Sequence, residues 1–87
     1  MAEFLVLTSI VESREKSAPF REAHFNYMAS LKKDGKLVIA GRFADGMGGG
    51  YILKANSADE AKALADHDPY HSSGARSYTI REWETRF

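Results

Sequence analysis

The chain has 87 residues, no cysteine, and a formal net charge of zero from twelve basic and twelve acidic side chains. A chain this short buries only about 60–65% of the surface that its unfolded form exposes. We therefore expect one thin-cored domain over residues 1–87 that gains stability as a homodimer. The lack of cysteine excludes disulfide bridges and thiolate metal sites. The balanced charge argues against nucleic acid or an anionic membrane as a partner.

The N-terminus has no predicted targeting or membrane segment. Met1 to Glu3 lead directly into an apolar stretch that is too short for a transmembrane span and has no basic region before it. We therefore expect a cytoplasmic protein whose partners are a small-molecule substrate and a second copy of the chain.

The first two predicted elements are a strand and a helix. Residues 4–10 are apolar on both alternating faces, which is typical of a strand covered on both sides. Ser17 is expected to cap a helix over residues 18–34, with Pro19 in its first turn. Gly35 supplies the stop of this helix.

The middle of the chain predicts two strands joined as a hairpin. Residues 37–41 are apolar and partly β-branched, which favours a central strand that ends near Phe43. Residues 44–50 are dense in glycine and predict the connection, and residues 51–55 follow as the third strand.

The last third predicts a helix and a final strand. Residues 57–60 form a capping box, and Pro69 bars continuation of the helix that this box opens. After a loop over residues 68–74, residues 77–83 alternate as a strand does. The order β-α-β-β-α-β is that of a ferredoxin-like α+β fold, a four-stranded antiparallel sheet with two helices on one face. The other sheet face needs a partner, which again predicts a homodimer.

His24 and Asp68 are the best candidates for chemistry. Helical spacing places His24 on the apolar stripe that faces the sheet, together with Phe20, Tyr27 and Leu31. A semi-buried imidazole needs a hydrogen-bond partner, and Asp68, on the inward continuation of the second helix, is the natural one. Such a pair suits general acid–base catalysis. The alternative is a core histidine and a turn-forming aspartate.

Arg42, Tyr51 and Tyr70 are candidates for substrate binding. Arg42, at the end of the second strand, could hold an anionic or phenolic oxygen, or form an exposed ion pair. Tyr51 and Tyr70 could line an aromatic pocket with Phe43, Tyr78 and Trp83, or these aromatic residues could fill the core and the dimer interface.

No metal or cofactor is predicted. His67 and His71 flank Asp68, but a zinc or iron site needs three or more convergent ligands, and their spacing crosses a proline. Residues 47–50 lack the helix and the lysine of a phosphate-binding loop. The last strand interleaves aromatic and basic residues, but it lacks the signature of an RNA-binding sheet.

Five short segments match the pattern of one known family. They are Ala23-His24-Phe25, Gly35, Ala40-Gly41, residues 57–61 and Asp68-Pro69-Tyr70. On these residues the whole chain resembles the YciI-like family of the dimeric α/β-barrel superfamily. The resemblance implies a ferredoxin-like dimer with a pocket in each subunit, and His24 and Asp68 as its active-site pair. One departure is Arg42, where many relatives have proline.

The family pattern also resembles enzymes of aromatic breakdown, namely lyases that eliminate chloride from a chlorinated hydroxyhydroquinone and isomerases of muconolactone type. The first hypothesis is therefore a cofactor-independent lyase or isomerase in which His24, oriented by Asp68, moves a proton on a cyclic or phenolic substrate. Arg42 or Tyr70 would steady a developing oxyanion. The alternative is a non-catalytic dimer that binds a small metabolite or acts as an accessory subunit.

Overall fold

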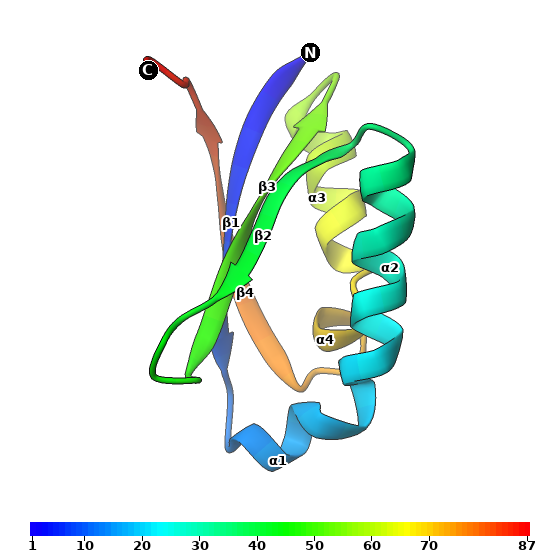
Figure 1. Ribbon diagram of the computed structural model, residues 1–87, viewed down its shortest axis with the longest axis vertical. Coiled ribbons are helices and arrows are strands. Elements are labelled where there is room, and N and C mark those ends of the chain that lie inside the picture. The colour runs from blue at the N-terminus through cyan, green and yellow to red at the C-terminus, as the bar shows by residue number, and fades with distance from the viewer.

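Four antiparallel strands form one sheet in the computed structural model, which describes residues 1–87. Their order across the sheet is β2-β3-β1-β4. The bounds are β1 (Ala2–Ile10), β2 (Leu37–Arg42), β3 (Gly48–Ala55) and β4 (Arg76–Trp83). The helices all lie on one side of this sheet (Figure 1). The predicted ferredoxin-like α+β fold is confirmed.

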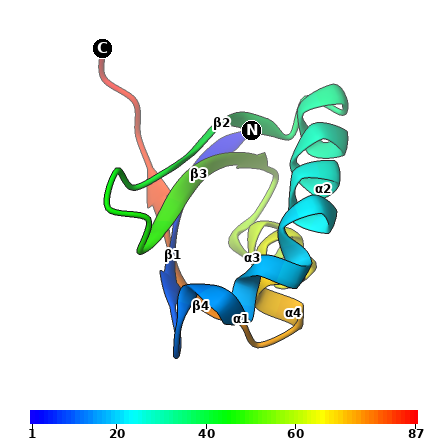
Figure 2. The same cartoon turned by 60° about the horizontal axis from the view of Figure 1, so that its bottom comes forward.

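Five helical segments cover that side. Two long helices lie against the sheet, and short segments precede and follow them (Figure 1). Figure 2 shows α1 and α4 at the same end of the molecule. The bounds are α1 (Arg14–Ser17), a 3₁₀ turn η1 (Ala18–Phe20), α2 (Arg21–Lys33), α3 (Ala58–Asp66) and α4 (Pro69–Ser72). No helix is long and apolar enough to cross a membrane.

The predicted start of the first helix at residue 18 is wrong. Helical turns begin at Arg14, and Ser17 is buried inside them rather than capping the next segment. The Ser17 hydroxyl donates to the carbonyl oxygen of Arg14 at 3.0 Å, so this side chain bonds backwards along the chain. Pro19, which has no N–H to donate, lies in the 3₁₀ turn before α2.

The predicted extent of the hairpin connection is also wrong. Gly48, Gly49 and Gly50 belong to β3, and the turn is limited to residues 43–47. A Cβ on Gly49 would overlap the carbonyl oxygen of Gly41, so the close approach of two strand backbones requires glycine there. The glycines therefore serve strand packing as well as the turn.

The segment after α3 also differs from the expected loop. Pro69 to Ser72 form the short helix α4, and Asp68 caps it by accepting a hydrogen bond from the Tyr70 N–H at 2.9 Å. The cap of α3 is as predicted, because the Ser57 hydroxyl accepts from the Glu60 N–H at 3.1 Å.

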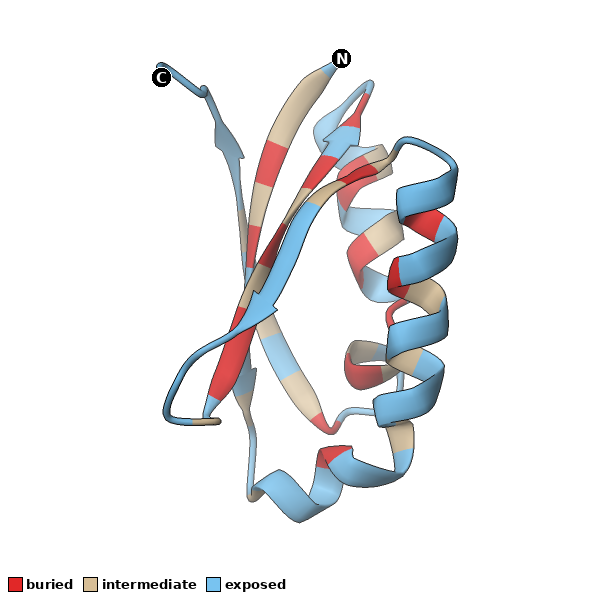
Figure 3. Cartoon of the chain, in the orientation of Figure 1, coloured by how far each residue is buried: buried red, intermediate tan, exposed pale blue.

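The core lies between the inner face of the sheet and the helices (Figure 3). Val6 and Leu53 of the two central strands are fully buried there, against Met28, Leu31 and Ala65 of the helices. A smaller cluster joins Phe4, Ala55 and Ala61.

The outer face of the sheet has no covering element. Strand alternation places five apolar side chains on it, and they come from all four strands: Leu5, Leu7, Ile39, Ile52 and Trp83. Ile39 is 60% exposed and Trp83 is 43% exposed.

Candidate functional site

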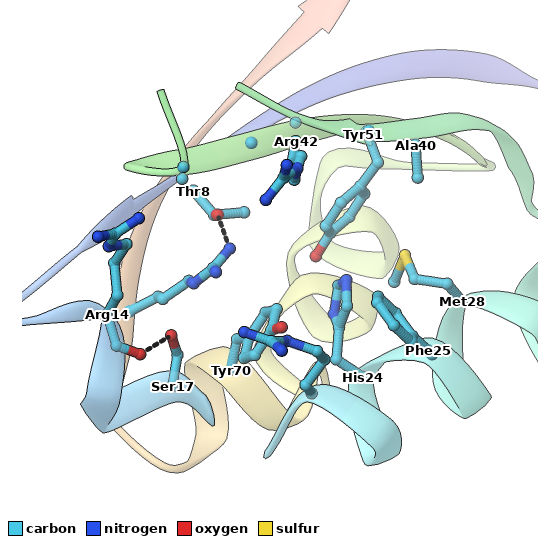
Figure 4. A pocket seen from close by; sticks show the side chains of 17 residues that line it. Thr8, Arg14, Ser17, His24, Phe25, Met28, Ala40, Arg42, Tyr51 and Tyr70 are labelled. Atoms are coloured by element: carbon cyan, nitrogen blue, oxygen red, sulfur yellow. Dashed lines mark hydrogen bonds between the residues drawn. The ribbon is translucent and has the colours of Figure 1, made fainter. Parts of the chain in front are cut away.

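A cavity of about 710 Å³ lies between the inner sheet face and the helices. All four strands and three of the helices, α1, α2 and α4, contribute to its wall (Figure 4). His24, Arg42, Tyr51 and Tyr70, four of the five predicted site residues, line it. The fifth, Asp68, is fully buried behind them.

His24 and Asp68 are in direct contact. His24 lies on α2, and its Nδ1 is 2.8 Å from Oδ1 of Asp68. The His24 side chain is 13% exposed, while that of Asp68 is 0% exposed. An ionised carboxylate only accepts hydrogen bonds, so we assign the proton of His24 to Nδ1. This tautomer leaves a lone pair on Nε2, the ring nitrogen that has no hydrogen-bond partner in the protein.

Asp68 accepts hydrogen bonds from three donors. Its Oδ1 accepts from His24 Nδ1 and from the Tyr70 N–H, and its Oδ2 accepts from the Tyr51 hydroxyl at 3.0 Å. Burial alone would raise the pKa of this carboxyl, but the hydrogen bond and charge of His24, together with the Tyr70 N–H, lower it below its ordinary value. Asp68 is therefore ionised at neutral pH and orients the imidazole.

The two tyrosines hold the pair from different sides. Burial raises the pKa of Tyr51, and the negative charge of Asp68 raises it further, so its hydroxyl stays protonated and acts as a donor. The ring of Tyr70 stacks on the imidazole of His24, with 4.2 Å between centroids and 21° between planes. This stacking restricts rotation of the imidazole about the Asp68 hydrogen bond.

Arg76 is a cavity residue that the sequence interpretation missed. Its guanidinium carbon lies 3.9 Å from the centroid of the Tyr70 ring, and its Nη1 donates to the Thr8 hydroxyl at 3.2 Å. Arg76, Tyr78 and Ile80 alternate along β4 on its inner face. This alternation was the available signal, because the burial of Ile80 against Val6 fixes which face the series occupies.

His71 was considered only as a metal ligand, and the structure gives it a different place. Its Nδ1 donates to the carbonyl oxygen of Ala65 at 2.7 Å and lies 4.0 Å from Oδ2 of Asp68. Burial lowers the pKa of His71. His67 is exposed and bonds to the Ala63 carbonyl. No group of three His, Asp or Glu side chains is arranged to hold a metal ion.

The wider aromatic pocket considered from the sequence is only partly present. Tyr51 and Tyr70 line the cavity, whereas Phe43, Tyr78 and Trp83 do not. Tyr78 packs against the core and donates to Asp66. Trp83 lies on the outer sheet face, opposite the helices.

A family model described as the YCII-related domain matches residues 2–84. The chain belongs to this family. The predicted resemblance to YciI-like proteins is thereby confirmed. The uncharacterized protein YjpA of Bacillus subtilis strain 168 is 33% identical over 63 residues, which cover 72% of this chain and 74% of YjpA.

Two solved structures share the fold. The first is 5-chloro-2-hydroxyhydroquinone dehydrochlorinase (TftG) from Burkholderia phenoliruptrix AC1100, in complex with 2,5-dihydroxybenzoquinone. It has a TM-score of 0.81 at 22% identity, covering 94% of this chain and 93% of TftG. The second is muconolactone isomerase, with a TM-score of 0.75 at 10% identity, covering 97% of this chain and 90% of that enzyme. At these identities the likeness establishes the fold alone.

Proposed function

We propose that this YCII-related chain is a homodimeric lyase or isomerase that acts on a small cyclic or phenolic substrate. His24 is its general base and acid, and Asp68 orients it. The observation that supports this most directly is the 2.8 Å contact between His24 Nδ1 and Asp68, which leaves Nε2 as the free nitrogen of a cavity-lining imidazole.

The proposed reaction begins with proton removal by Nε2 of His24 from a carbon or hydroxyl of the substrate. The electron pair left behind forms a new C=C or C=O bond. In an elimination, a leaving group such as chloride departs with its bonding electrons, and the imidazolium releases its proton to solvent. In an isomerisation, the imidazolium returns the proton to another carbon of the same molecule. Proton transfer of this kind needs no cofactor.

Asp68 stabilises the imidazolium that forms during this reaction, because its carboxylate is ionised and hydrogen-bonded to Nδ1. Tyr51 keeps the carboxylate in place from the other oxygen. Arg42 lines the same cavity and can hold an oxyanion as charge develops on the substrate. We assign Asp68 and Tyr51 as positioning residues and His24 as the catalytic one.

The structural neighbours agree with this proposal at the level of the fold. One is a dehydrochlorinase of a chlorinated hydroxyhydroquinone and the other is an isomerase of a lactone. Both reaction types involve proton transfer on a cyclic molecule. Because one fold hosts many activities, the proposal depends on the His24–Asp68 geometry rather than on the neighbours.

The homodimer is proposed from the outer sheet face. Its apolar side chains, including Leu7, Ile39 and Trp83, remain exposed in one chain. Exposed apolar surface of this kind marks an interaction site. A second copy packing the same face would bury these residues and give the first strand the cover on both sides that its composition requires.

The test is turnover of a panel containing 5-chloro-2-hydroxyhydroquinone and muconolactone, followed by chloride release and ultraviolet absorbance. His24→Asn keeps an amide N–H for Asp68 but removes Nε2, and we expect it to lower kcat by about 10²–10⁴-fold while the fold is kept. His67→Asn is the matched control and should leave kcat unchanged. Full activity of His24→Asn would refute the proposal. Loss of folding in that variant would instead support the reading of His24 as a core histidine.

A further inference from the structure

Four arginines converge on the cavity from four different elements. Arg14 comes from α1, Arg21 from the start of α2, Arg42 from the end of β2, and Arg76 from the start of β4. No aspartate or glutamate is among the 17 lining residues. None of the four arginines forms an ion pair with a carboxylate. In a chain whose net charge is zero, this places a local excess of positive charge at the candidate site.

Arg76 is held in place rather than free in solvent. The Thr8 hydroxyl accepts from its Nη1, and its guanidinium lies over the Tyr70 ring. Its Nε is buried and has no hydrogen-bond partner in the protein. The buried Nε is closed to a ligand, whereas Nη2 has no hydrogen-bond partner in the protein and can donate to a ligand oxygen.

Arg42 faces the same space across a glycine. In the sheet, Gly49 pairs with Thr8 on one side and with Arg42 on the other. The three positions share the inner face, and Gly49 has no side chain to separate its two neighbours. The guanidinium groups of Arg42 and Arg76 can therefore reach one ligand group above Gly49.

The opposite end of the cavity is apolar. In the view of Figure 4, Arg14 and Thr8 lie at one end, Phe25, Met28 and Ala40 lie at the other, and His24 lies between them. A ligand that fills this cavity therefore meets cations at one end and apolar side chains at the other.

We infer that the substrate is a cyclic acid, in which an oxoanion is attached to an apolar or aromatic ring. The oxoanion, a carboxylate or a phosphate ester, binds Arg76 and Arg42, since a guanidinium pairs with either in a bidentate manner. The ring then lies toward Phe25 and Met28 and passes Nε2 of His24. This inference rests on the proposed function only for the role of His24. It goes further by restricting the proposed substrate class to ring compounds that carry an oxoanion, a group that 5-chloro-2-hydroxyhydroquinone in the turnover panel lacks.

The test is calorimetric titration of the wild-type homodimer with benzoate, phenyl phosphate and benzamide. Benzamide has the shape of benzoate without its charge. We expect benzoate or phenyl phosphate to bind about tenfold or more tightly than benzamide, and added salt to weaken the two anions selectively. Preference for benzoate assigns a carboxylate, and preference for phenyl phosphate assigns a phosphate ester.

Two variants locate the anion. Arg76→Gln and Arg42→Gln should each reduce the preference for the anion by about tenfold, whereas Arg86→Gln, an equal charge change in the exposed C-terminal segment, should keep it. Arg42 is exposed, so Arg42→Gln remains informative if Arg76→Gln fails to fold. Equal or absent binding of the three probes, or an equal loss in Arg86→Gln, overturns the inference.

The outcome is separable from the proposed reaction. His24→Asn should bind the anions as the wild type does, because the arginines do not depend on Nε2. A wild-type protein that binds the anions selectively but turns over no substrate would contradict the proposed function and leave the anion site standing.

Discussion

Nδ1 of His24 and Oδ1 of Asp68 lie 2.8 Å apart although 44 positions separate them in the chain. The contact forms because α2 presents His24 toward the segment where α3 ends and α4 begins. Asp68 also caps α4, so its carboxylate stabilises this helix as well as binding His24. Substitutions at Asp68 therefore change both the stability of the fold and the proposed chemistry. The dependence of the unfolding free energy on pH reports the first of these effects.

Asp68→Asn should lower the free energy of unfolding by about 2–4 kcal/mol near neutral pH. The substitution removes the buried negative charge, which strengthens the hydrogen bonds that Asp68 accepts and attracts His24. The folded-state pKa of Asp68 is lowered, so its stabilisation is present above the ordinary carboxyl value and is lost as the pH falls below about 4. Urea unfolding across this pH range is the measurement.

In that experiment the unfolding free energies of the wild type and Asp68→Asn should converge in acid. Asp66→Asn, at an exposed carboxylate two residues away, should show a smaller loss at neutral pH. A difference between the wild type and Asp68→Asn that is the same at all pH values would contradict an ionised Asp68.

Tyr51→Phe removes one donor from the same carboxylate. We expect it to lower the free energy of unfolding by about 1.5–3 kcal/mol, because hydrogen bonds to a charged acceptor are stronger than neutral ones. It should also raise the pKa of Asp68, measured by NMR titration of the carboxyl carbon. Tyr27→Phe is the matched control, since the Tyr27 hydroxyl donates to the Leu64 carbonyl at 2.7 Å.

The control should cost about 1 kcal/mol of unfolding free energy and shift the carboxyl titration less than Tyr51→Phe does. Equal titration shifts in the two variants would show that the Tyr51 hydroxyl has no special role at Asp68.

Much of the fold was predictable because it depends on local periodicity. The stripe that includes His24, and the hydrogen bond in the Ser57 cap, are properties of neighbouring residues and were predicted correctly. The contact between His24 and Asp68 was reached by combining the fold with the inward face of each helix. From the sequence, its catalytic role was suggested by the family resemblance alone, and the 2.8 Å contact now gives the proposal its geometric support.

Other features depend on contacts between distant segments and were missed. A run of glycines has the composition of a turn, and only the approach of the Gly41 backbone to Gly49 places it in a strand. Likewise, the alternation along β4 gives the face on which Arg76 lies, but the contact of its guanidinium with Thr8, 68 positions away in the chain, has no local signature in the sequence.

The outer sheet face gives a prediction about assembly. If it is the homodimer interface, Ile39→Lys buries an unpaired ammonium there and should raise the Kd of the dimer by about 100-fold or more. Analytical ultracentrifugation measures this. Val11→Lys changes a side chain of similar exposure, 56% against 60%, just beyond the end of β1 and should leave the dimer intact. A monomeric wild type, or dissociation by both variants, would contradict the proposed interface.

His71 gives a prediction at higher pH. Burial is the largest influence on its pKa and lowers it below the ordinary value of 6.5, against the opposing effects of the Ala65 carbonyl and Asp68. The unfolded chain therefore binds a proton at this residue before the folded chain does. Stability must fall as the pH drops below about 6.5, by up to about 1.4 kcal/mol per pH unit from this group.

His71→Asn keeps an N–H that can donate to the Ala65 carbonyl but cannot titrate, so it should flatten the dependence of unfolding free energy on pH between about 6.5 and 5. Chemical denaturation at several pH values measures this slope. His67→Asn removes an exposed histidine from the neighbouring turn and should leave the slope as in the wild type. Because Asp68 acts only below about pH 4, the two titrations occupy separate windows. An unchanged slope in His71→Asn would mean that the folded protein takes up the His71 proton as readily as the unfolded chain does, and would contradict the lowered pKa of this residue.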